Sequence, residues 1–123
     1  MNDLQMGAVE SRFADIIWEN EPLSSAELAR KSNELLKWKK STTYTVLRRL
    51  CDKGIFKNEK GTVSSIISRE KYYSLQSANF VDEAFDGSLP AFIAAFISHK
   101  ELTAKEAEEI QRMIDDFRKE GGE

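Results

Sequence analysis

The sequence predicts a mainly α-helical chain that contains one small β-hairpin. Apolar residues recur at helical spacing in three segments between residues 6 and 54. Short β-branched segments then follow on either side of Lys60-Gly61, and helical spacing returns from residue 69 onward. Three helices followed by a two-stranded ribbon form the plan of a winged helix-turn-helix domain. We therefore expect such a domain over residues 1–67 and a helical dimerisation domain over residues 68–123.

The first two helices are predicted from apolar spacing and from a capping signal. The first is expected over about residues 7–20, with Glu21-Pro22 ending it. Its apolar positions, at i, i+3, i+4 spacing, are Met6, Val9, Phe13, Ile16 and Ile17. Ser24 and Glu27 have the spacing of a capping box, in which the serine and the glutamate cap the same helix start. A second helix is therefore expected from Ser24 to Leu36.

The third helix, within Trp38–Gly54, carries the strongest functional signal. Ser41 is expected at its N-cap, and Gly54 stands where a helix commonly ends. One face, expected to pack on the core, holds Thr43, Val46, Leu47 and Leu50. The other face holds Thr42, Tyr44, Thr45, Arg48, Arg49 and Asp52. Small polar side chains and cations on a short helix suit a DNA major groove, where they meet base edges and phosphates. The alternative is an amphipathic surface helix with a solvated basic face.

The β-branched segments at residues 55–59 and 62–67 predict the hairpin of the wing. Lys60 is the cation at its tip, so we expect a weak wing contribution to DNA binding. Three helices are expected after the hairpin. Their predicted starts are Ser68, the segment Ser88-Leu89-Pro90, and a second capping box formed by Thr103 and Glu106.

Charge is distributed unevenly along the chain. The net formal charge is −3, but residues 37–60 hold eight Lys or Arg residues and two acidic residues, for a net of +6. Residues 1–75 carry a net of +3, whereas residues 76–123 carry −6. This division favours a DNA-contacting part joined to a part that is kept off the DNA.

Composition argues against several other classes of protein. Hydrophobic residues make up 41% of the chain and charged residues 32%, which is ordinary for a globular domain. No run approaches the roughly 18 apolar residues of a membrane helix, so no membrane insertion is expected. A single cysteine agrees with the reducing cytoplasm, and one His with one Cys predicts no zinc site and no cofactor. No nucleophile–base pair or pair of carboxylates suggests an enzyme.

The last two expected helices carry more large apolar residues than they can bury by themselves. About 50 residues in three helices form a marginal core. DNA-binding modules of this size commonly work as two-fold dimers. We therefore expect a homodimer held by Phe92, Phe96, Ile110, Met113, Ile114 and Phe117.

A family resemblance extends over about residues 6–118. The residues that carry it are Ile16-Ile17-Trp18, Ser25 to Leu28, Trp38, Thr42 to Leu50, Lys53-Gly54, Ile66 to Glu70 and Asn79-Phe80. In their order and spacing they resemble the penicillinase repressor family, which includes the methicillin-resistance repressor and copper-responsive repressors. The resemblance implies a winged-helix domain, a helical dimerisation domain, and repression by binding a dyad-symmetric operator.

The resemblance also implies roles for single residues. Major-groove contacts fall on Ser41, Thr42, Tyr44 and Thr45. Backbone contacts fall on Lys39, Lys40, Arg48 and Arg49, with Lys60 added by the wing. Tyr44 stands where some members carry arginine, so their operator sequence does not transfer. For Arg49 a second role stays open, as the partner in a structural ion pair.

Induction is the point at which this sequence departs from the family. Repressors of β-lactam resistance are cut by a membrane sensor protease at an Asn-Phe bond, and the matching pair here is Ala95-Phe96. The C-terminal cysteine motif of the copper-responsive branch has no counterpart after Cys51. The resemblance implies control of a β-lactam-resistance gene. The alternatives are an unrelated regulon with a different inducer, or a winged helix that binds protein instead of DNA.

Overall fold

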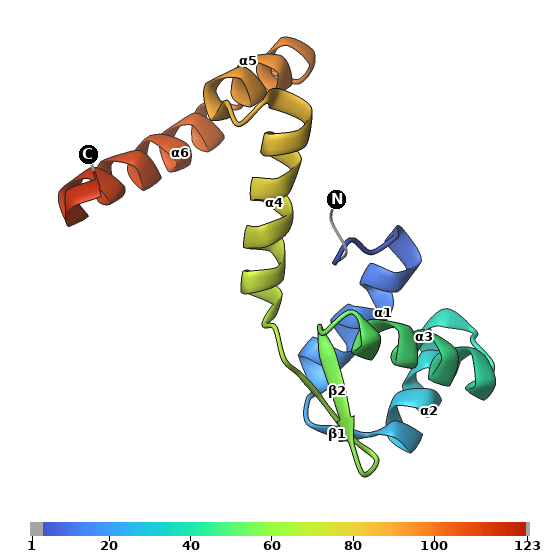
Figure 1. Cartoon of the computed structure of the whole chain (residues 1–123). Helices are drawn as coiled ribbons and strands as arrows, with labels where there is room; N and C mark the ends of the chain where they lie inside the picture. Colours follow the sequence, from blue (N-terminus) through green and yellow to red (C-terminus); the bar gives the residue numbers. More distant parts are fainter. Residues whose placement is uncertain (1–3, 123) are drawn as a thin grey trace. The chain divides into compact units, whose positions relative to one another are not determined.

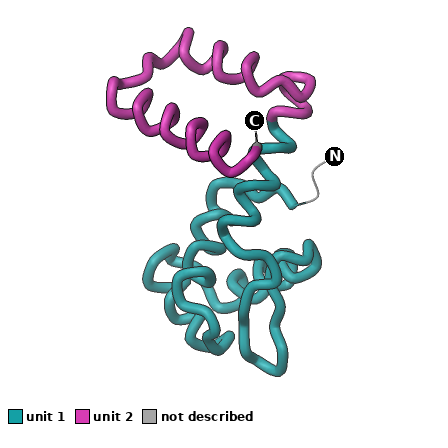
Figure 2. The backbone as a smooth tube through the Cα atoms, turned by 90° about the vertical axis from the view of Figure 1, so that its left-hand side faces the viewer, with its two compact units in different colours: residues 1–80 teal, residues 81–123 magenta. Residues whose placement is uncertain are grey.

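A computed structural model describes residues 4–122 of the chain, and the described chain divides after residue 80 into two compact units (Figure 2). Within the described residues there are six α-helices and one three-stranded antiparallel sheet. The predicted fold class, a winged helix followed by helices, is confirmed (Figure 1).

The first unit contains the winged helix. Its elements are α1 (Ala8–Asn20), β1 (Leu23–Ser24), α2 (Ser25–Leu36), α3 (Lys40–Asp52), β2 (Phe56–Glu59), β3 (Thr62–Ser65) and the first turns of α4 (Arg69–Phe85). The sheet order is β1-β3-β2, and Glu59 pairs with Thr62. Lys60 and Gly61 between them have φ of 53° and 88°, as a two-residue hairpin turn requires. The sequence reasoning missed β1, because two residues are too few to show an alternating pattern.

The start of α2 agrees with the prediction, whereas the start of α3 does not. The Ser24 hydroxyl accepts the Glu27 N–H at 3.0 Å, as a cap should. The predicted N-cap of α3 at Ser41 is wrong. The cap is Lys39, which makes no side-chain capping bond, and Ser41 lies in the first turn.

Tertiary contacts explain where α3 begins. Lys37 takes the left-handed conformation, with φ of 61°, and ends α2. The Trp38 ring then packs on Phe13 with 5.0 Å between ring centroids, and the Asn33 amide donates to the Trp38 carbonyl at 3.0 Å. Packing of Trp38 and the end of α2 therefore place the turn, without a capping hydroxyl.

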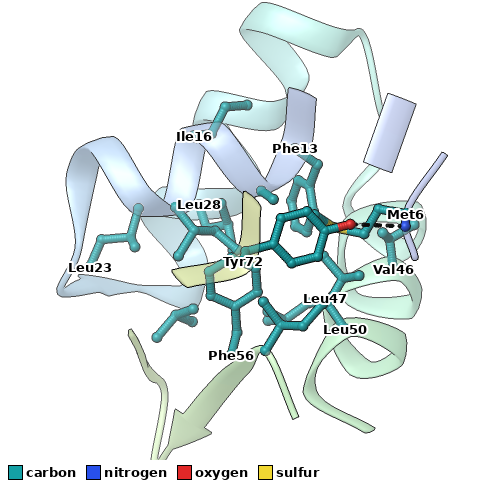
Figure 3. Packing of buried hydrophobic residues seen from close by; sticks show 14 residues of the cluster. Met6, Phe13, Ile16, Leu23, Leu28, Val46, Leu47, Leu50, Phe56 and Tyr72 are labelled. Atoms are coloured by element: carbon teal, nitrogen blue, oxygen red, sulfur yellow. Dashed lines mark hydrogen bonds between the residues drawn. The ribbon is translucent and has the colours of Figure 1, made fainter. Parts of the chain in front are cut away.

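The core of the first unit lies where the three helices meet the sheet (Figure 3). Its largest fully buried side chains include Phe13, Ile17, Leu28, Leu50 and Phe56. Burying such a side chain contributes about 1.5–3 kcal/mol relative to leaving it in water. This filled core gives α3 a rigid support.

The root of α4 belongs to this same core. Tyr72 is buried, and its hydroxyl accepts the Met6 N–H at 3.1 Å (Figure 3). The Trp18 indole donates to the Ile67 carbonyl at 3.0 Å, and Arg69 lies 3.2 Å from Asp15. These contacts tie the start of α4 to the first unit, which extends to residue 80, beyond the functional boundary that we predict after residue 67.

The second unit contains the end of α4, α5 (Leu89–His99), α6 (Ala104–Phe117) and a final π-helical turn (Arg118–Gly122). Both helix starts were predicted correctly. The Ser88 hydroxyl caps α5 by accepting the Ala91 N–H at 3.1 Å, and Thr103 with Glu106 forms the capping box of α6. None of the residues of α5 and α6 is buried within the chain that the structure describes.

Candidate nucleic-acid interface

Helix α3 has a buried face and an exposed face, divided as the sequence predicts. The four residues expected in the core are all buried, namely Thr43, Val46, Leu47 and Leu50. Helical geometry places Ser41, Tyr44, Thr45 and Arg48 in one row on the opposite side. Ser41, Thr45 and Arg48 are exposed, and Tyr44 is partly exposed. The scaffold therefore presents hydroxyls, an aromatic ring and a cation along one edge of α3.

The N-terminal half of α3 holds the groups that suit base edges. Thr45 donates its hydroxyl proton to the Ser41 carbonyl at 3.0 Å, which leaves its oxygen lone pairs and its methyl group available outward. The Lys40 ammonium lies 5.8 Å from the centre of the Tyr44 ring, within cation–π range. Lys39 and Thr42 are exposed beside them. Two lysines thus stand at the end of α3 that carries the hydroxyls.

The two adjacent arginines differ in their surroundings. The Arg49 guanidinium lies 2.9 Å from the Glu10 carboxylate of α1. Among the described residues Arg48 forms no ion pair, and it remains exposed on the row with Tyr44 and Thr45. The structural ion pair left open for Arg49 by the sequence is therefore present.

A hollow of about 460 Å³ lies between the start of α2, the exposed edge of α3 and strand β2. It is lined by Ser25, Tyr44, Leu47, Arg48, Cys51 and Asn58. The Asn58 side-chain amide oxygen accepts the Gly61 N–H at 3.0 Å, which ties this side chain to the hairpin turn. Burial, with a smaller contribution from the charge of Asp52, raises the pKa of the Cys51 thiol, so the thiol stays neutral.

Sequence reasoning missed Ser25 and Asn58 as parts of this surface. Ser25 follows the cap of α2, and Asn58 lies in β2 next to the hairpin turn. Neither carries a local signal of function. They join Arg48 because α2 and β2 both pack against α3.

The wing offers one cation at its tip. Lys60 is exposed at the turn of the hairpin, separate from the row on α3. Lys57 on β2 is paired with Glu59 at 3.0 Å. The structure thus gathers most of the predicted DNA-contacting residues on α3 and leaves Lys60 apart.

The residues predicted to hold a dimer lie on α5 and α6. Phe96, Met113, Ile114 and Phe117 are each about half exposed or more, and Ile110 is at the edge of exposure. Phe92 is partly covered, with its ring 5.5 Å from that of Phe85. These side chains leave a large apolar surface on the second unit without cover from the described chain.

The family model of the penicillinase repressor matches residues 6–116. The chain belongs to the penicillinase repressor family. It is similar to the penicillinase repressor of Bacillus licheniformis, with 22% identity over 118 residues that cover 93% of this chain and 92% of the relative. It is also similar to the penicillinase repressor of Staphylococcus aureus, with 23% identity over 120 residues that cover 94% and 95%. The family is one of transcriptional repressors and not of enzymes.

In this member of the penicillinase repressor family the Ala95-Phe96 bond lies inside α5. Ala95 is exposed, and its carbonyl accepts the Ser98 hydroxyl at 2.8 Å. Within residues 4–122, no cluster of three or more His, Cys, Asp or Glu side chains is placed to hold a metal ion. No helix in the same range is long and apolar enough to cross a membrane.

Proposed function

We propose that this penicillinase repressor family member is a homodimer that represses transcription by binding a dyad-symmetric DNA operator. The observation that carries the proposal is the division of α3, whose buried face fixes the helix while the opposite face presents hydroxyls and Arg48, a cation that forms no ion pair among the described residues. A helix supported in this way can enter a major groove without losing core packing.

The contacts separate by chemistry along α3. Ser41, Thr42, Tyr44 and Thr45 are assigned to base edges, because hydroxyl and phenol groups both donate and accept hydrogen bonds. Lys39, Lys40 and Arg48 are assigned to phosphates on either side of the groove. Base contacts then determine which sequence is preferred, whereas phosphate contacts determine most of the salt-dependent affinity.

The hollow beside α3 suits the sugar-phosphate backbone that adjoins the major groove. Leu47 and Cys51 provide an apolar floor for a sugar, and Arg48, Ser25 and Asn58 provide polar groups around it. Lys60 reaches the backbone from the tip of the wing. Since the wing has only this one cation free of an ion pair among its described residues, its contribution is small.

A second copy of the chain is the partner that best covers the apolar faces of α5 and α6. The exposed residues Phe96, Met113, Ile114 and Phe117 are too large a group to remain in water in a stable protein. Two copies related by a two-fold axis bury the same face twice and present two α3 helices to two half-sites.

Relief of repression by proteolysis follows from this arrangement. A cut at Ala95-Phe96 removes Phe96 and all of α6, so the dimer loses most of its apolar contact surface. A membrane sensor protease in a β-lactam-resistance system is the agent that the family resemblance nominates. Alanine replaces the family's asparagine at the cut, and this departure favours a different inducer and regulon as the second candidate.

The experiment is selection of bound duplexes from a random DNA library by the full chain, followed by affinity measurements at several salt concentrations. The expected result is a dyad sequence bound about 10³-fold or more tightly than its scrambled version. Arg48→Ala should lower the salt slope on both duplexes by about one unit. Absence of any enriched sequence, with no salt-dependent binding, would indicate the protein-interaction alternative instead.

A further inference from the structure

Glu10 occupies an unusual position between α1 and the recognition helix. Its carboxylate receives a hydrogen bond from the Arg49 guanidinium at 2.9 Å on one oxygen, and from the Gly7 N–H at 3.2 Å on the other. The Lys53 ammonium lies 4.0 Å away. One acidic group of the first helix thus faces two cations at the C-terminal end of α3.

The geometry of this cluster holds the Glu10 carboxylate in place and restrains the Arg49 side chain. The Glu10 side chain is only 18% exposed, whereas Arg49 is 54% exposed. Lys53 is tethered further by a hydrogen bond from its ammonium to the Gln5 carbonyl at 2.7 Å. Glu10 therefore lies on the inner side of the pair, and Arg49 covers it from the solvent side.

Electrostatics keep the Glu10 carboxylate charged. Burial acts to raise its pKa, but the hydrogen bonds from Arg49 and Gly7 and the charges of Lys53 and Arg49 outweigh burial, so the pKa lies below its usual value. The carboxylate is thus negative at neutral pH. A negative charge 2.9 Å from a guanidinium cancels much of the attraction that this guanidinium offers to a more distant phosphate.

We infer that Glu10 is a positioning residue that withholds Arg49 from the DNA backbone and so limits sequence-independent binding. The inference rests on the proposed DNA-binding function. It assigns opposite roles to neighbouring arginines, since Arg48 contacts phosphate and Arg49 does not. Because Glu10 touches none of the residues assigned to base edges, it sets how strongly the repressor holds any DNA without changing the preferred sequence.

The test compares Glu10→Gln with the unaltered full-length chain on the selected operator and on its scrambled version, at salt concentrations from 50 to 200 mM. Glutamine keeps the shape and the Gly7 contact but removes the charge. Release of one cation to a phosphate should steepen the salt slope on both duplexes by about 0.9, equivalent to a ~3–4-fold larger loss of affinity over this salt range. The preferred sequence should not change.

The matched control is Asp52→Asn, which removes the same charge from the same end of α3 but releases no paired cation among the described residues. It should leave the salt slope unaltered. Arg49→Gln in the otherwise unaltered chain should also leave the slope unaltered, and the double variant of Glu10→Gln with Arg49→Gln should return to the original slope.

Two outcomes would overturn the inference while the operator is still bound by the unaltered chain. One is an unchanged slope in folded Glu10→Gln, and the other is a slope lowered by about one in Arg49→Gln. Arg49→Gln keeps Glu10 in place, so its salt slope tests the inference even if Glu10→Gln unfolds. A chain that shows no salt-dependent binding at all would instead overturn the proposed function, and this inference with it.

Discussion

The two compact units of this chain solve the problem of apolar surface in different ways. In residues 1–80 the apolar faces of α1, α2 and α3 meet one another and the sheet, and residues such as Phe13, Leu28 and Phe56 are fully buried. In residues 81–123 the helices also carry large apolar residues, yet none of the residues of α5 or α6 is buried. The winged helix buries its core within a single copy, whereas the second unit leaves the apolar residues of α5 and α6 without cover from the described chain.

This contrast separates folding from assembly. The core contacts of the first unit lie within one chain, so we expect its stability not to depend on protein concentration. We expect the stability of the second unit to rise with concentration, because burial of its apolar faces depends on a second copy.

The strongest test ends the chain after Ala95, which removes Phe96 and all of α6. The first unit keeps its core, so it should remain folded and bind a single half-site as before. Affinity for the complete dyad should fall by about 10²–10⁴-fold, because two winged-helix domains joined in a dimer bind far better than two separate ones. Fluorescence anisotropy on half-site and full-site duplexes measures both values. Equal affinity of the two proteins for the dyad would show that the second unit does not join the winged-helix domains.

Phe56→Ala should destabilise the first unit to the same extent whether or not the protein is assembled into a dimer. Phe56 is fully buried, and its ring lies 5.2 Å from that of Trp18. The cavity left behind should lower the free energy of unfolding by about 3–5 kcal/mol. Chemical denaturation should give the same loss at low and high protein concentration. A loss that disappears as protein concentration rises would mean that assembly also stabilises the winged helix.

Ile114→Asp should weaken dimerisation through the second unit while it has little effect on the single chain. Ile114 is about half exposed in the single chain, so the substitution costs little there. In a dimer it would bury an unpaired charge, at a cost of about 3 kcal/mol or more. Sedimentation at low micromolar concentration should show monomers, with Ile114→Val as the control that stays dimeric. A fully dimeric Ile114→Asp chain would place the interface elsewhere.

Thr43→Val tests the cost of one buried hydroxyl in the core of the first unit. The Thr43 hydroxyl is buried and has no hydrogen-bond partner among the described residues. Valine has nearly the same shape without the polar atom, so the free energy of unfolding should rise by about 1 kcal/mol. Thermal unfolding measures the change, and Thr42→Val on the exposed face should give none. Destabilisation by Thr43→Val would indicate that its hydroxyl is satisfied in solution.

Much of the fold follows from local sequence signals. The serine cap at Ser24 and the capping box at Thr103 act between residues three positions apart, and the hairpin turn depends only on the backbone dihedral angles of Lys60 and Gly61. The buried face of α3 follows from helical spacing alone. Each of these features has a signal within a few neighbouring residues or helical turns, so it can be predicted from the sequence alone.

Features that depend on residues far apart in the chain follow only from tertiary packing. Lys39, and not Ser41, precedes α3 because Trp38 packs on Phe13. Arg49 pairs with Glu10, which lies 39 positions earlier in the chain. The residues next to Glu10 in the sequence do not indicate this ion pair. In the unfolded chain, an arginine side chain can approach many different acidic groups. Only the packing of α1 against the rest of the core selects one of them.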